Sequence, residues 1–126
     1  MRWVRCLIAA VLAELAAIVV LVLVVAVLAP RDPAAAQAYA EGLGRFVGPI
    51  AGFLFGVLGG YFVARPLRAA HLKHGAFFGI LFALTDIALL AVSQAPFEWL
   101  FVVSNVGRVI GAILGARLAR GRRDVL

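Results

Sequence analysis

Residues 6–29 read CLIAAVLAELAAIVVLVLVVAVLA, an apolar run whose single charged residue is Glu14. About 20 apolar residues, each rising ~1.5 Å, are enough for a helix to cross the hydrocarbon core of a bilayer. The run is also longer than the apolar core of a signal peptide, which has about 7 to 15 residues. We therefore expect residues 6–29 to form a retained membrane-spanning helix.

Three further apolar runs meet the same length criterion, at residues 46–64, 75–94 and 98–116. The chain is 65% hydrophobic and 14% charged, whereas soluble domains are roughly 45–50% apolar and about 25% charged. A chain of 126 residues cannot bury that much apolar surface in water. The sequence predicts an all-α fold, a four-helix transmembrane bundle that forms one domain over residues 1–126.

Lysine and arginine residues are concentrated on one side of the predicted membrane. Nine of the twelve lie before the first run, between the second and third, or after the fourth, and two lie in the opposite loops. The nine are Arg2, Arg5, Arg65, Arg68, Lys73, Arg117, Arg120, Arg122 and Arg123, and the two are Arg31 and Arg45. Because cytoplasmic segments carry the excess of basic residues, we expect both termini in the cytoplasm, with a bacterial inner membrane as the location.

The distribution of these basic residues also indicates which partners the chain binds. They occupy short segments between apolar runs instead of one face of a folded domain, so the net charge of +6 does not indicate nucleic acid. We expect the basic loop and the basic cytoplasmic tail at 117–126 to contact anionic lipid headgroups. Residues 121–126 of this tail are expected to be frayed and solvated.

The first outer loop carries signals for a short helix. Asp32 suits the N-cap, Pro33 suits the first helical position and Gly42 suits the end. We expect a short interfacial helix over residues 33–41, separate from the span at 46–64. An ordered coil is the alternative.

The two halves of the chain resemble each other. Residues 12–16, LAELA, match residues 84–88, LTDIA, and residues 47–52, VGPIAG, match residues 106–111, VGRVIG. Matched segments cross the membrane in the same direction, which indicates a duplicated helical hairpin around an axis along the membrane normal. This alignment makes Glu14 equivalent to Asp86. Chance similarity between apolar helices is the alternative.

Small residues recur at every fourth position along the predicted helices, as in a glycine zipper. The glycines are Gly48, Gly52, Gly56 and Gly60, then Gly75 and Gly79, and then Gly107, Gly111 and Gly115. This spacing forms a groove that lets a neighbouring helix approach closely. We expect these glycines to pack helices within one bundle. A homodimer interface, or a contact in a larger membrane complex, is the alternative.

Three ionisable residues lie well inside the predicted spans, where a charge costs at least about 2.5–3.5 kcal/mol. They are Glu14, Asp86 and Arg108, and they are accompanied by Thr85, Ser104 and Asn105. From the helical rise, Glu14 and Arg108 lie roughly 13 Å from the same membrane edge, and Asp86 and Asn105 roughly 18 Å. We therefore expect Arg108 to pair with Glu14 and Asn105 with Asp86. The Arg108 side chain is also long enough to reach both acids.

This cluster has two interpretations. It fixes helix register in a structural or accessory subunit of a membrane assembly, although interhelical polar contacts contribute only about 0.6 kcal/mol on average. Alternatively, because two acids face one arginine, one carboxyl carries a proton near neutral pH, as a small proton-coupled transporter requires. An ion or water channel is a further alternative.

Residues 9–15, AAVLAEL, resemble the first helix of the small multidrug resistance transporters. These are short four-helix proteins, and a glutamate in that helix is their shared proton and cation site. The resemblance implies this role for Glu14. The chain departs from the family in Asp86, in Arg108, in its long first outer loop and in lacking the family's tryptophan in helix 3. Its glycine-rich appearance also resembles small four-helix bacterial membrane proteins of unknown function.

Other reactive side chains indicate no site. Cys6 is the single cysteine, which excludes a disulfide within the chain, and we expect a buried, inert thiol. His71 and His74 fall in a short basic loop that we expect to be solvated, and two histidines without a carboxylate do not indicate a metal site. The sequence predicts no enzyme activity and no cofactor.

Overall fold

The computed structural model describes residues 3–94 and 96–125, which form four α-helices. The helices are α1 (Trp3–Leu28), α2 (Pro33–Ala64), α3 (His71–Val92) and α4 (Trp99–Val125). All four are long and apolar enough to cross a membrane. The fold is therefore all-α, and its four candidate spans point to a multi-pass membrane protein. Arg2 and Leu126, which belong to the predicted basic ends, lie outside the described residues.

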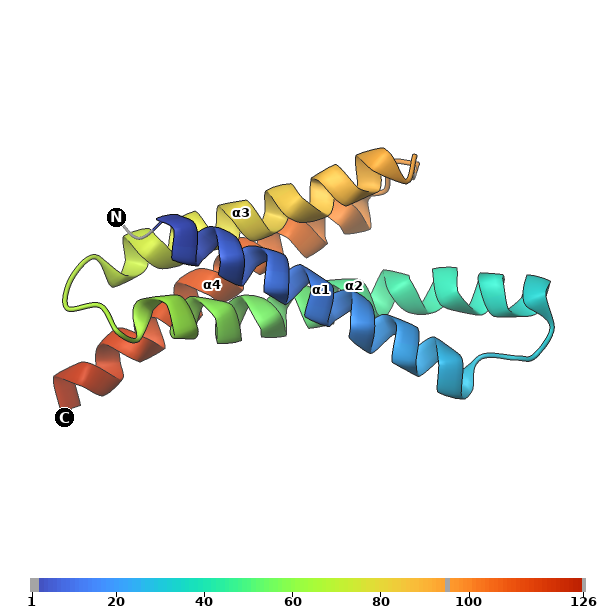
Figure 1. Cartoon of the computed structure of the whole chain (residues 1–126). Helices are drawn as coiled ribbons and strands as arrows, with labels where there is room; N and C mark the ends of the chain where they lie inside the picture. Colours follow the sequence, from blue (N-terminus) through green and yellow to red (C-terminus); the bar gives the residue numbers. More distant parts are fainter. Residues whose placement is uncertain (1–2, 95, 126) are drawn as a thin grey trace.

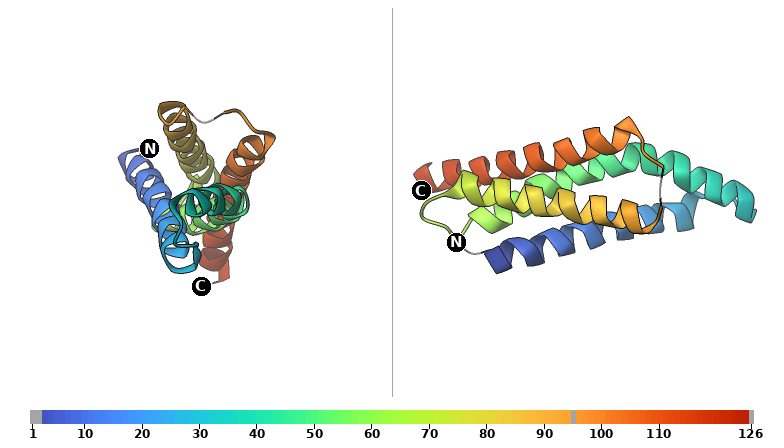
Figure 2. Two further views of the ribbon diagram at one scale, coloured as in Figure 1. Left: turned by 90° about the vertical axis from the view of Figure 1, so that its right-hand side faces the viewer. Right: turned by 90° about the horizontal axis from the view of Figure 1, so that it is seen from above.

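The helices form two hairpins, α1–α2 and α3–α4, whose connections lie at the same end of the molecule (Figure 1). We call this the distal end. The start of α1, the end of α4 and the α2–α3 connection lie at the opposite end, which we call the terminal end. The two hairpins diverge towards the distal end, and α1–α2 extends further than α3–α4 (Figures 1 and 2).

α2 is one continuous helix where the sequence predicted two, at 33–41 and 46–64. The predicted start is confirmed, because the Asp32 carboxylate accepts a backbone N–H of the first turn at 3.0 Å and Pro33 begins the helix. The predicted end at Gly42 is wrong. A glycine ends a helix when the backbone turns to positive φ, and no glycine among the described residues has positive φ. The helix therefore continues through Gly42.

The other helices also differ from their predicted limits. α4 continues to Val125, so the expectation of a frayed end at 121–126 is wrong for residues 121–125, which are helical. Its arginines and alanines are good helix formers, and Ala119 is buried beside Ala64. α3 begins four residues before the predicted start, which places His71 and His74 in its first turn. Both histidines are buried there, and the expectation of a solvated loop is wrong.

α2 and α4 run in the same direction and pack closely through glycine (Figure 1). A Cβ atom added to Gly56 would lie 2.8 Å from the Arg108 carbonyl oxygen, and one added to Gly111 would lie 2.5 Å from the Phe53 carbonyl oxygen. Neither position can accept a side chain without moving the opposite backbone. A backbone or Cβ atom of a neighbouring helix lies equally close to Gly60, Gly75, Gly79 and Gly115. These glycines pack within the chain.

Apolar side chains fill the terminal half of the bundle. Phe78 and Phe82 stack with their ring centroids 5.7 Å apart, and both are fully buried. The rest of this cluster is Cys6, Ala9, Ala10, Ala13, Val63 and Ala112. The distal half is different, because no described residue of α2 before Ala51, and none between Ala83 and Ser104, is buried. The helices therefore separate above the level of the predicted polar cluster.

Candidate functional site

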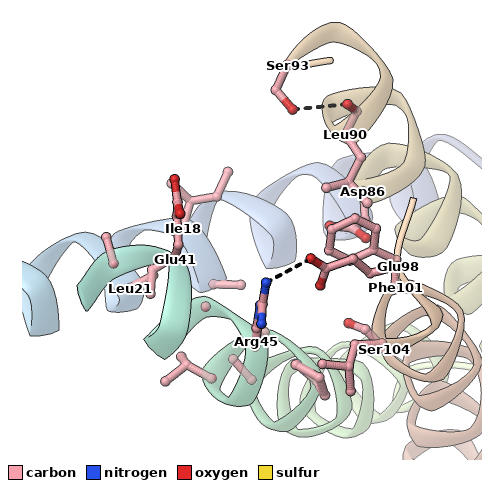
Figure 3. A pocket seen from close by; sticks show the side chains of 18 of the residues that line it. Ile18, Leu21, Glu41, Arg45, Asp86, Leu90, Ser93, Glu98, Phe101 and Ser104 are labelled. Carbon is pink, nitrogen blue, oxygen red and sulfur yellow. Dashed lines mark hydrogen bonds and ion pairs between the residues drawn. The ribbon is translucent and has the colours of Figure 1, made fainter. Parts of the chain in front are cut away.

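A cavity of about 680 Å³ lies between the hairpins in the distal half, and all four helices line it (Figure 3). Its residues form three levels. The floor carries Glu14, Asp86, Ser104 and Arg108, the walls carry Ile18, Leu21, Leu90 and Phe101, and the rim carries Glu41, Arg45 and Glu98. The site is an apolar cavity with charged groups at both ends.

At the floor, Arg108 joins the two acids. Its Nη2 atom lies 3.4 Å from Oε2 of Glu14 and 3.4 Å from Oδ1 of Asp86. The Arg108 and Glu14 side chains are 3% and 6% exposed, and that of Asp86 is 16% exposed. Because both oxygens approach the same nitrogen, the two carboxyls converge on one point. α1, α3 and α4 each supply one of the three side chains.

Asn105 supports Asp86 from the same helix as Arg108. Its Nδ2 atom donates to Oδ2 of Asp86 at 3.0 Å and to the Phe101 carbonyl at 2.8 Å. The structure therefore brings together both pairs that the depth argument predicted, and Arg108 reaches both acids. Ser104 joins the group because its hydroxyl accepts a hydrogen bond from Nη1 of Arg108.

Thr85 is the one predicted member that the structure does not bring into the cluster. Its hydroxyl donates to the Leu81 carbonyl at 2.8 Å. A threonine inside a helix commonly donates its hydroxyl proton to the carbonyl of the residue four positions earlier, as Thr85 does here. Adjacency to Asp86 in the sequence suggested a contact, but the two side chains point in different directions around α3.

The floor has one more acid than base. Two carboxyls and one guanidinium give a formal charge of −1 if both acids are ionised. Two carboxylates that share one site in a medium of low dielectric constant do not readily ionise together. The floor of the cavity is therefore suited to hold one additional positive charge, either a proton or a cation.

The rim carries an ion pair that sequence patterns did not predict. Nη2 of Arg45 lies 3.1 Å from Oε1 of Glu98, and the pair joins α2 to the segment just before α4 (Figure 3). Their side chains are 57% and 30% exposed. Both residues lie near the predicted outer ends of helices and therefore at similar depth in the membrane. They are 53 positions apart in the sequence, so no short-range sequence pattern indicates that they pair.

The predicted glycine stripes do not have a single role. Gly48 and Gly107 were expected to pack helices, but a Cβ atom added at either position would meet nothing within 4 Å. That expectation is wrong because both glycines lie in the distal half, where the helices have separated. Gly52 contacts a side chain instead of a helix backbone, since a Cβ atom there would lie 2.8 Å from Nη1 of Arg108.

No protein-family model, curated protein or solved structure gives a significant match to this chain. The resemblance of residues 9–15 to the small multidrug resistance transporters therefore rests on those residues alone.

Proposed function

We propose that the chain is a small proton-linked carrier of the bacterial inner membrane, in which Glu14 and Asp86 hold the coupling proton. The observation that carries this proposal is the position of the two acids. They lie at the floor of a cavity of about 680 Å³, where a solute and water can reach them. A carboxyl that binds a proton in the core of a bundle is what proton coupling needs.

The charge balance at the floor indicates how coupling works. A proton on one carboxyl leaves the other to pair with Arg108, and the floor is neutral. A cationic solute that enters the cavity competes for the same surplus negative charge, so its binding releases the proton. The solute class that fits this exchange is a small cation.

The basic residues set the orientation in this proposal. Arg5, Arg65 and Arg117 belong to the terminal end, where the excess of positive charge lies. With that end in the cytoplasm, the cavity opens on the opposite side of the membrane. A carrier then needs a second state in which the floor is reached from the cytoplasm.

The filled terminal half favours a carrier over an ion or water channel. Among the described residues, Phe78, Phe82 and Ala112 are fully buried below the floor, which closes the cavity there. A channel requires a continuous path, whereas a carrier exposes its site on one side at a time.

A structural or accessory subunit is the second candidate. The observation that favours it is the contact of Arg108 with Glu14 and Asp86, which joins three helices and would fix their register. Against it, the glycines at which α2 and α4 meet are covered within the chain, so they leave no groove for a partner helix; they are Gly56, Gly60, Gly111 and Gly115. An accessory subunit also has no need for a cavity above the acids.

Proton movement in proteoliposomes tests the carrier. A pH-sensitive dye is trapped inside, and small cationic, neutral and anionic solutes are added in turn. We expect cationic solutes to produce a saturable pH change that Glu14→Gln and Asp86→Asn each abolish. Asp32→Asn is the matched control, because it also replaces an acid by its amide, lies outside the cavity and keeps a residue that caps helices well. The carrier is rejected if no solute class moves protons in a manner that depends on Glu14.

A further inference from the structure

Gly52 differs from the other buried glycines in what it faces. A Cβ atom added there would lie 2.8 Å from Nη1, 3.0 Å from Cζ and 3.2 Å from Cγ of Arg108. One turn later, a Cβ atom on Gly56 would meet the α4 backbone instead. Gly56 therefore permits the close approach of two helices, whereas Gly52 makes room for one guanidinium group.

The same guanidinium also lies over an aromatic ring. The Arg108 Cζ atom lies 4.8 Å from the centroid of the Phe82 ring, an arrangement that attracts a cation to the aromatic face. Phe82 is fully buried and cannot easily turn aside. Ser104 holds Nη1 from within α4. We call the space bounded by Gly52, Phe82 and Ser104 the arginine slot.

The slot explains an unusual feature of the ion pairs. Charge-assisted N–H···O⁻ bonds are typically about 2.7–2.9 Å long, and arginine prefers to bind a carboxylate through two parallel bonds. Here Arg108 uses a single nitrogen for both acids, at 3.4 Å from each. The Nε atom is buried with no hydrogen-bond partner among the described residues. A guanidinium that was free to move would turn towards one acid and form the two-bond pair.

We propose that Gly52 is a positioning residue, which holds Arg108 in the slot as a fixed counter-ion shared between Glu14 and Asp86. In this position the guanidinium neutralises one of the two acids without binding either tightly. The floor then retains one exchangeable positive charge, which sets the coupling at one proton for each singly charged solute. This inference rests on the proposed carrier, because it assigns the means by which the acid pair keeps its exchangeable site.

The test is the reactivity of Glu14 with an apolar carbodiimide, which attacks protonated carboxyls, measured by mass spectrometry on the full chain in lipid vesicles. In Gly52→Ala the guanidinium is displaced, and we expect labelling of Glu14 at neutral pH to rise severalfold. Gly107→Ala is the matched control, because a Cβ atom there meets nothing within 4 Å. We expect that variant to label like the wild type.

Two further variants separate position from packing. In the Arg108→Lys background Nη1, the atom that the new methyl group meets most closely, is absent, so we expect Gly52→Ala to add little to Glu14 labelling. Gly60→Ala strains the same helix contact at the Ala112 backbone, away from Arg108, and we expect lower thermal stability with little change in labelling. If Gly52→Ala does not fold, Phe82→Leu removes the aromatic wall of the slot and is expected to raise labelling in the same way.

The proposal is overturned if Gly52→Ala, or Phe82→Leu in its place, leaves Glu14 labelling at the wild-type level. It is also overturned if Gly60→Ala raises labelling as much, or if the Gly52→Ala effect persists undiminished beside Arg108→Lys. Labelling needs no transported solute. A positive result here with no solute-driven proton movement would therefore reject the carrier and leave the slot in place.

Discussion

Gly56 and Gly111 occupy equivalent positions on the two sides of the α2–α4 contact. Gly56 faces the carbonyl oxygen of Arg108, and Gly111 faces the carbonyl oxygen of Phe53. The same shift of 55 positions relates Gly56 to Gly111 and Phe53 to Arg108. Exchanging the two helices therefore reproduces the contact.

One turn further along, the relationship holds again. Gly60 faces the carbonyl of Ala112, and Gly115 faces the carbonyl of Val57, with the same shift between the two members of each pair. The two helices thus meet through a symmetric backbone contact, with glycine at the points of closest approach. The cavity floor is built on this contact, because Arg108 belongs to it.

Glycine-to-alanine substitutions on this contact are expected to have unequal effects. Gly60→Ala and Gly115→Ala force backbone away from backbone, and overpacking of this kind costs typically 1–3 kcal/mol, so we expect a loss of about that size. Gly107→Ala enters open space and is expected to leave stability unchanged or slightly raised. Unfolding in mixed micelles measures all three. Equal stabilities would show that the helices do not meet as described.

Removing Arg108 alone is expected to destabilise the fold strongly. Arg108→Leu leaves two buried acids without their cation, and breaking a buried pair from one side costs roughly 3–5 kcal/mol. Adding Glu14→Gln and Asp86→Asn to Arg108→Leu is expected to recover most of that loss, because no unpaired charge remains. If the variant with all three substitutions is no more stable than Arg108→Leu, the charges hold the fold, and this result favours a structural subunit over a carrier.

The rim pair is expected to contribute little to stability. Arg45 and Glu98 are both partly exposed, and exposed ion pairs are worth about 0–1 kcal/mol. A double-mutant cycle with Arg45→Ala and Glu98→Ala is therefore expected to give a coupling energy within that range, and salt is expected to reduce it. A larger coupling that is insensitive to salt would show that the rim is closed and dry.

Cysteine labelling is expected to map the cavity and the orientation together. The single native cysteine is fully buried, so Cys6→Ala gives a silent background. A membrane-impermeant maleimide added outside intact cells is expected to label Leu21→Cys and Leu90→Cys, which line the cavity, and to leave Ala10→Cys unlabelled. Labelling of the two cavity positions only after the cells are opened would reverse the proposed orientation.

Much of the architecture follows from the sequence because the bilayer restricts the options. Hydropathy and length identify four spans. Depth along each helix pairs Arg108 with Glu14 and Asn105 with Asp86, since side chains at the same level in parallel and antiparallel helices can meet. Asp32 and Pro33 mark the start of α2 because aspartate is a preferred N-cap residue and proline is favoured at the first helical position.

Other features could not be predicted from the sequence, for physical reasons. Glycines at every fourth position match equally well when one segment is moved by one helical turn. The sequence repeat therefore paired Gly52 with Gly111, whereas in the α2–α4 contact the counterpart of Gly111 is Gly56, four positions later. Gly42 resembles a helix end, but glycine also tolerates helical φ, and the context keeps α2 continuous. The role of Gly52 is not encoded in its spacing at all, because it depends on which side chain of another helix lies opposite.

The central claim is that the floor of the cavity keeps one exchangeable proton on the Glu14–Asp86 pair. Infrared difference spectroscopy of the protein in lipid, at neutral pH and without a cationic solute, observes the C=O stretch of a protonated carboxyl directly. We expect one such band that shifts promptly in D₂O and is lost or displaced in both Glu14→Gln and Asp86→Asn. A spectrum with no band that depends on these residues, or a band that does not exchange with D₂O, would mean a dry and fully paired cluster and would contradict the carrier.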